Sequence, residues 1–99
     1  MSTITIDLQE GFADDTIIIK IDGQEMLHQA NLTTDYSIGL AHSAQVEVPE
    51  GQVEIDVSIP SRRLSRSIKL DVSTPVYLGV SLSENKIEHQ ASSEAFIYF

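Results

Sequence analysis

The feature that most constrains this chain is residues 45–59, where apolar and polar side chains alternate on both sides of Pro49, Glu50 and Gly51. Strand side chains point to opposite faces in turn, so a period of two predicts strands with one buried face. Pro49 suits the second position of a type I turn, and Gly51 can take the positive φ of a bulged hairpin loop. We therefore predict a β-hairpin whose buried face carries Val46, Val48, Val53, Ile55, Val57 and Ile59.

Shorter segments with the same alternation recur along the chain. Asp22 and Gly23 are a favoured pair for a two-residue hairpin turn, so a strand over 16–21 should pair with one that begins at Gln24. The 45–59 hairpin is expected to lie beside the strand 67–72, and Lys69 and Arg66 would offset its carboxylates. The predicted strands outside the hairpin cover residues 3–8, 16–21, 24–28, 67–72, 76–82, 87–90 and 95–99.

Seven to eight short strands with almost no helical periodicity are typical of two packed antiparallel sheets. The predicted fold class is an all-β, two-sheet antiparallel sandwich, immunoglobulin-like or transthyretin-like, and a small partly open barrel fits the same pattern. Residues 31–44 lack the alternation, and Thr33 or Thr34 could cap one short helical turn near 34–40. No linker divides the chain, so we expect a single domain over residues 1–99.

The charge balance argues against several classes of function. Fifteen acidic and six basic residues give a formal charge of −9, which disfavours binding to nucleic acid or to an anionic membrane surface. There is no cysteine, and no signal-like leader or apolar run of ~20 residues is seen. We expect a soluble, cytoplasmic protein.

Residue patterns that support catalysis are missing from the sequence. No Gly-x-Ser-x-Gly elbow, nucleotide-binding glycine loop or His-Glu-x-x-His run occurs. His28, His42 and His89 are too far apart to show metal-ligand spacing. We therefore expect no enzymatic activity, no catalytic or metal-binding residues and no cofactor.

Acidic loops offer one alternative to this expectation. Asp14, Asp15 and Asp22 bracket the second predicted strand, and Asp35 lies in the irregular segment. Calcium prefers several carboxylate and carbonyl oxygens, so these loops would form a site if they met at one end of a sandwich.

Four of the six basic residues fall within eight positions. They are Arg62, Arg63, Arg66 and Lys69. This segment could hold an anion or an acidic partner, or it could simply balance neighbouring carboxylates.

The chain ends in an aromatic, β-branched stretch that suits a last strand. In residues 95–99 both faces are apolar, so one sheet cannot cover both. The second face is expected to pack on this domain or on a partner chain, which makes Phe96, Ile97, Tyr98 and Phe99 the candidate interface.

Residues 19–25 and 46–55 together carry a family resemblance. An apolar strand that ends in Asp22-Gly23 is followed later by a turn with Pro49 and Gly51 and an alternating strand. This pairing resembles small bacterial β-sandwich modules of the PEGA and carboxypeptidase-regulatory, transthyretin-like type. The resemblance implies a noncatalytic accessory or adhesion-like module, with no catalytic residues to carry over.

The function that we predict from the sequence is a noncatalytic interaction or accessory module that self-associates, as in a homodimer, or docks on a larger protein partner. The alternative is a small-ligand or ion-binding sandwich, which would hold calcium in the acidic loops or an anion on the segment 62–69.

Overall fold

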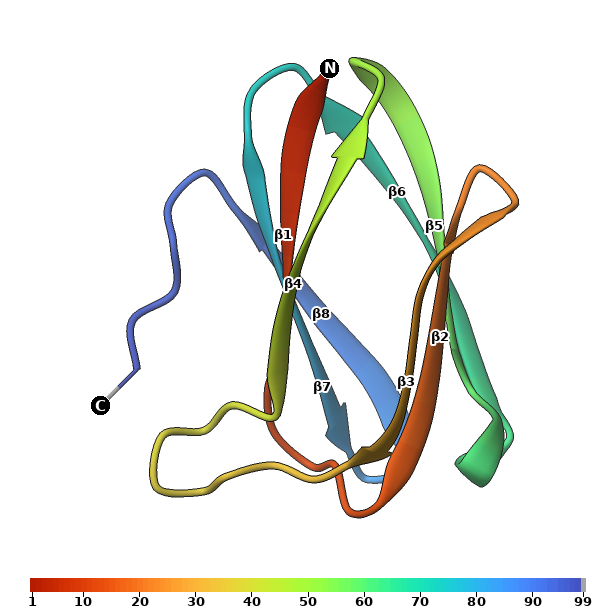
Figure 1. Cartoon of the computed structure of the whole chain (residues 1–99), viewed down its shortest axis with the longest axis vertical. Coiled ribbons are helices and arrows are strands. Elements are labelled where there is room, and N and C mark those ends of the chain that lie inside the picture. The colour runs from red at the N-terminus through yellow and green to blue at the C-terminus, as the bar shows by residue number, and fades with distance from the viewer. Residues whose placement is uncertain (99) are drawn as a thin grey trace.

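The computed structural model describes residues 1–98 and contains eight strands in two four-stranded sheets that face each other (Figure 1). The first sheet has the order β4(His42–Val48), β1(Ser2–Leu8), β7(Val76–Ser83) and β8(Lys86–Ser92). The second has the order β3(Gln24–Leu32), β2(Asp15–Ile21), β5(Gly51–Ile59) and β6(Leu64–Val72). A short 3-10 helix, η1(Pro60–Arg62), joins β5 to β6. The chain is thus an all-β sandwich, as predicted.

Five of the six strand pairings are antiparallel, and the exception lies at the centre of the first sheet. There β1 runs parallel to β7, with Ile4 opposite Val76 and Leu8 opposite Val80. The first strand of the chain therefore lies between two strands that come much later in the sequence, β4 and β7.

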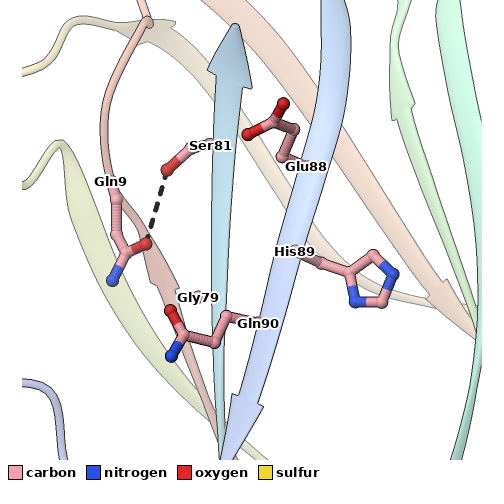
Figure 2. A pocket seen from close by; sticks show the side chains of 6 residues that line it. All are labelled: Gln9, Gly79, Ser81, Glu88, His89 and Gln90. Carbon is pink, nitrogen blue, oxygen red and sulfur yellow. Dashed lines mark hydrogen bonds between the residues drawn. The ribbon is translucent and has the colours of Figure 1, made fainter.

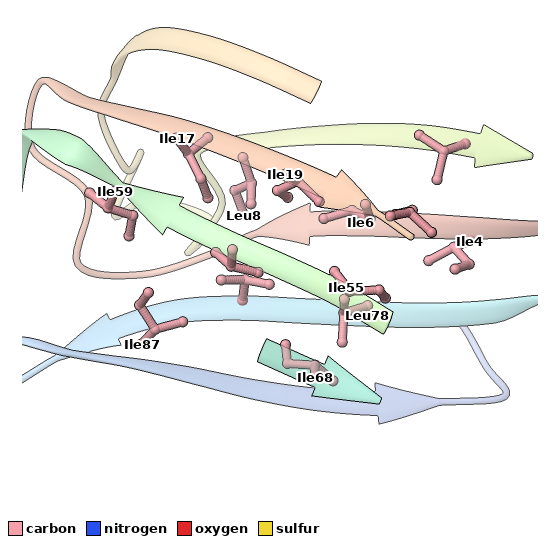
Figure 3. Close-up of a cluster of buried hydrophobic side chains, with 14 of the residues drawn as sticks. Ile4, Ile6, Leu8, Ile17, Ile19, Ile55, Ile59, Ile68, Leu78 and Ile87 are labelled. Atoms are coloured by element: carbon pink, nitrogen blue, oxygen red, sulfur yellow. The ribbon is translucent and has the colours of Figure 1, made fainter. Parts of the chain in front are cut away.

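One apolar core fills the space between the sheets (Figure 3). Every strand contributes its inward side chains, and fully burying one such aliphatic side chain stabilises the fold by about 1.5–3 kcal/mol. The most deeply buried side chains are Phe12, Ile4, Ile6, Leu8, Ile17, Ile19, Ile55, Ile59, Leu78, Val48, Val57 and Val72.

The predicted 45–59 hairpin is wrong in its pairing, although its buried face is right. β4 pairs with β1, whereas β5 pairs with β2 and β6, so residues 49–50 cross from one sheet to the other. Val46 and Ile55 both point into the core, but they do so from opposite sheets. Alternation records which face of a strand is buried and not which strand is its neighbour, so the pattern looks the same in both arrangements.

Two local predictions are confirmed. β2 and β3 form a hairpin through Asp22 and Gly23, which both have positive φ, of 50° and 84°. β6 lies beside β5, and Lys69 stands directly opposite Glu54 in the register. The positive charge of Lys69 therefore lies beside the acidic outer face of β5, as the sequence predicts.

The segment between β3 and β4 forms a turn and no helix. The Asp35 carbonyl accepts hydrogen bonds from the Ile38 and Gly39 N–H groups at 3.1 and 2.8 Å. Its carboxylate Oδ1 accepts from the Ser37 N–H and hydroxyl at 3.0 and 2.6 Å. Thr34 does not cap this turn, because its hydroxyl donates to the Gln9 carbonyl and accepts from the Phe12 N–H.

The predicted last strand is also absent. After β8 the chain leaves the sheet, and residues 93–98 have no strand pairing and run beside the first sheet (Figure 1). Phe99 lies outside the described residues. Within residues 1–98, no helix is long and apolar enough to cross a membrane.

Candidate binding surface on the first sheet

Asp7 is a carboxylate on the outward side of β1, yet only 6% of its surface is exposed. The Tyr98 hydroxyl donates to its Oδ2 at 2.6 Å, and the Ser43 hydroxyl donates to its Oδ1 at 2.6 Å. Ser43 stands opposite Asp7 in the β1–β4 register, whereas Tyr98 arrives from the C-terminal segment. Two hydroxyl donors compensate the desolvation of this carboxylate.

Gln9 continues this arrangement just beyond the end of β1. Its N–H donates to the Val80 carbonyl at 2.8 Å, which keeps the chain against β7. Its side-chain Nε2 donates to the Tyr98 hydroxyl at 3.0 Å, and its Oε1 accepts from the Ser81 hydroxyl at 3.4 Å. The amide is thus oriented at both ends. We call Asp7, Gln9 and Ser43 the Tyr98 seat.

Gly79 makes room for the Gln9 amide. It stands opposite Asp7 on one side and Gln90 on the other, on the outward face of β7. A Cβ atom at this position would lie 2.7 Å from Gln9 Oε1 and 2.9 Å from Nε2. A side chain here would therefore move the amide from its position.

An open hollow of about 130 Å³ lies over Gly79, beside the seat (Figure 2). Gln9 and Ser81 border it on one side, and Glu88 and Gln90 on the other, while the His89 ring points away from Gln9. The hollow offers hydrogen-bond donors and acceptors, and a carboxylate at Glu88.

Tyr98 is the group on this surface whose titration is most altered. Burial and the hydrogen bond to the Asp7 carboxylate raise its pKa to about 12, although the bond from Gln9 opposes this shift. Burial penalises the charged phenolate, and the hydrogen bond to the Asp7 carboxylate favours the protonated phenol. Tyr98 therefore stays a hydrogen-bond donor throughout the physiological pH range.

The basic segment predicted from the sequence does not form one patch. The Arg62 guanidinium binds Asp15 Oδ1 and Oδ2 at 2.9 and 2.8 Å and donates to the Gly11 carbonyl. Arg66, on the edge strand β6, donates to the Ile87 carbonyl at 2.8 Å, on the edge strand β8 of the other sheet. Lys69 faces outward beside Glu54, and Arg63 is exposed with a left-handed φ of 55° after η1.

The acidic loops do not converge either. Asp15 and Asp22 lie at opposite ends of β2, and Asp22 Oδ1 accepts from the Glu54 N–H. The Asp15 carboxylate is occupied by Arg62, and that of Asp35 by Ser37. Within residues 1–98, no three acidic or histidine side chains form a group that could hold a metal ion.

The structure places the residues of the predicted C-terminal interface in different environments. Tyr98 binds the seat, Phe96 is half-buried and Ile97 is 78% exposed. Sequence reasoning missed Asp7, Gln9 and Ser43, because only the fold brings them to Tyr98. Gly79 was the one available signal, since a glycine inside a strand often marks a close approach.

Comparison with family models, curated proteins and solved structures finds no match to this chain. The resemblance to PEGA-type modules therefore stays a prediction.

Proposed function

We propose that this chain is a noncatalytic protein-interaction module that associates with a second copy or with a larger protein through exposed apolar side chains near the end of β1. Four large apolar side chains stand exposed in the described chain: Met1, Tyr36, Ile38 and Ile97. The observation that carries the proposal is that three of them belong to two segments that contact the same few residues.

Those segments are the loop 33–41 and the C-terminal segment 93–98. The loop is attached by the Ala41 N–H to the Leu8 carbonyl at 2.7 Å and by the Thr34 hydroxyl to the Gln9 carbonyl at 2.7 Å. The C-terminal segment is attached through Tyr98 to Asp7 and Gln9. Figure 1 shows both segments projecting on the side of the first sheet.

Exposed apolar side chains grouped in this way favour association. Tyr36 and Ile97 are 68% and 78% exposed, and covering their apolar surface would gain about 25 cal/mol for each Å² removed from water. Aromatic side chains supply much of the energy of protein interfaces. The calcium and anion alternatives lack comparable support, because Asp15 and Arg62 already satisfy each other.

The test compares the wild-type chain with the triple variant Tyr36→Ser, Ile38→Ser, Ile97→Ser. We expect the wild type to show a concentration-dependent mass in sedimentation, or a specific cross-linked partner from a photo-reactive group placed in the loop 33–41. Both signals should disappear in the triple variant and persist in Met1→Ser, which removes an equally exposed apolar side chain from the other end of β1. A wild type that stays monomeric and gives no cross-link that the triple variant lacks would refute the proposal.

A further inference from the structure

We propose that the Tyr98 seat is a recognition site for an extended, positively charged protein segment that presents a tyrosine, and that the chain's own C-terminal segment occupies it until such a segment displaces it. This inference rests on the proposed interaction function, and it names the surface and the chemistry of the partner.

The bound Tyr98 shows what the seat accepts. Its phenol hydroxyl donates to Asp7 and accepts from Gln9, so the seat matches a group that is donor and acceptor at once. A phenylalanine in the same place would leave the nearly buried Asp7 carboxylate without one of its two donors. Loss of a hydrogen bond to a buried charged group carries a full desolvation cost, so the seat discriminates tyrosine from phenylalanine.

The chain's own segment is hydrogen-bonded to the sheets at one residue. Within residues 1–98, the hydrogen bonds that tie residues 93–98 to the sheets are those of the Tyr98 side chain. The Glu94 N–H bonds only to the nearby Ser92 hydroxyl, and Ile97 is largely exposed. Such a segment can leave without unfolding the sheets, because its release breaks no strand pairing.

The charge of the surrounding sheet favours a basic partner. The strands of the first sheet carry three carboxylates, Asp7, Glu47 and Glu88, and a single cation, Lys86, which lies at the start of β8. The whole chain has a net charge of −9. Complementary charge speeds the encounter and disfavours acidic competitors.

A partner must also compete with a tethered occupant. A short tether holds Tyr98 near the seat at an effective concentration of the order of millimolar. The hollow over Gly79 supplies the additional contacts that a partner needs, because Gln9 belongs to the seat and also lines the hollow. Ser81, Glu88 and Gln90 line the hollow, whereas residues 93–98 do not.

The experiment uses the full chain with Tyr98→Ala, which empties the seat, and two synthetic hexapeptides. The first has the sequence of residues 93–98 with lysine in place of glutamate (Ser-Lys-Ala-Phe-Ile-Tyr), and the second ends in phenylalanine instead. Binding is followed by amide chemical shifts. We expect the tyrosine peptide to shift Asp7, Gln9, Ser43 and Gly79, and to bind at least about tenfold more tightly than the phenylalanine peptide, as expected for one lost hydrogen bond.

Three comparisons make the result specific. The tyrosine peptide should bind the wild-type chain at least about tenfold more weakly, because Tyr98 competes from within. His28→Ala, which removes an exposed ring from β3 of the second sheet, should behave as the wild type. Adding Asp7→Asn to the Tyr98→Ala chain should weaken binding, with the thermal midpoint measured to verify that this chain is folded.

Equal binding of the two peptides, or equal binding to the wild type and the Tyr98→Ala chain, would overturn the inference. So would shifts that lie away from the seat, or no shifts at all. These failures leave the sedimentation and cross-linking results at Tyr36, Ile38 and Ile97 intact, so failure of this inference is distinguishable from failure of the proposed function.

Discussion

Asp15 is the least exposed carboxylate of the described chain, with 2% of its surface accessible. Burial alone would raise its pKa, but hydrogen bonds from Arg62, the Ala13 N–H and Ser61 outweigh that effect and hold the pKa below its usual value. A bidentate guanidinium–carboxylate pair of this kind also fixes geometry. It ties η1 to the loop between β1 and β2, because Arg62 binds the Gly11 carbonyl as well.

Arg62→Met is therefore expected to lower the free energy of unfolding by about 3 kcal/mol at neutral pH, since it leaves a buried carboxylate without its cation. Urea unfolding followed by circular dichroism measures this change. Arg63→Met is the matched control, because Arg63 is exposed at the neighbouring position and should change stability by less than about 0.5 kcal/mol.

The effect of Arg62→Met should also depend on pH. The pKa of Asp15 is depressed in the folded state, so its stabilisation is present above the unfolded pKa of about 3.9 and is lost as pH falls through the folded value. The difference between wild type and variant should shrink below about pH 4. A difference that stays constant down to strongly acidic pH would mean that Arg62 acts through packing and not through its charge.

The elements show what the sequence could and could not predict. The inward faces of β4, β5 and β7 were predicted correctly, because burial of one face imposes a period of two on any strand. The pairing partner of β4 was not predicted correctly. Val46 and Val48 alternate with polar residues in the same way whether β4 pairs with β5 in a hairpin or lies across the core from it. The pattern of residues 95–98 predicted a strand because most of them are aromatic or β-branched, but in the structure this stretch pairs with no strand.

The Tyr98 seat could not be predicted from the sequence either. Asp7 and Tyr98 are 91 positions apart, and each is an ordinary polar or aromatic residue in its own segment. The pairing of β1 with β4 and β7 places Ser43 and Gly79 around Asp7, and only then is there a site for the phenol. Sequence could name Tyr98 as an interface residue but could not say what it would meet.

Tyr98→Phe should lower the free energy of unfolding by about 1–2 kcal/mol at pH 7, because Asp7 loses a donor. The raised pKa of about 12 means that this stabilisation is complete below the unfolded tyrosine pKa of about 10 and is lost as pH rises to 12. Absorbance at the phenolate band measures the titration directly. The wild type should show a step near pH 12 that Tyr98→Phe lacks; if the two titrations coincide there, Tyr98 does not hold its proton against Asp7.

At the scale of the whole molecule, strand pairing brings distant parts of the chain together, whereas the net charge opposes their compaction. The central β1–β7 pair joins the first strand to the seventh, so the first sheet is complete only when both parts of the chain are in place. No local pattern in the sequence predicts this parallel pairing of β1 with β7. Folding also gathers fifteen carboxylates and six cations into a small volume, and the net charge of −9 opposes that compaction.

Screening should therefore stabilise the protein. Raising the ionic strength from about 0.01 to 0.15 M shortens the Debye length from roughly 30 to 8 Å, which weakens long-range repulsion but leaves buried pairs such as Asp15–Arg62 nearly unchanged. We expect the urea midpoint at pH 7 to rise with added sodium chloride. The same experiment near pH 4.5, the isoelectric point calculated from the sequence, should show little change, because the net charge is then close to zero. An equal rise at both pH values would assign the effect to general salt strengthening of apolar burial, and net charge would then not limit the stability of this sandwich.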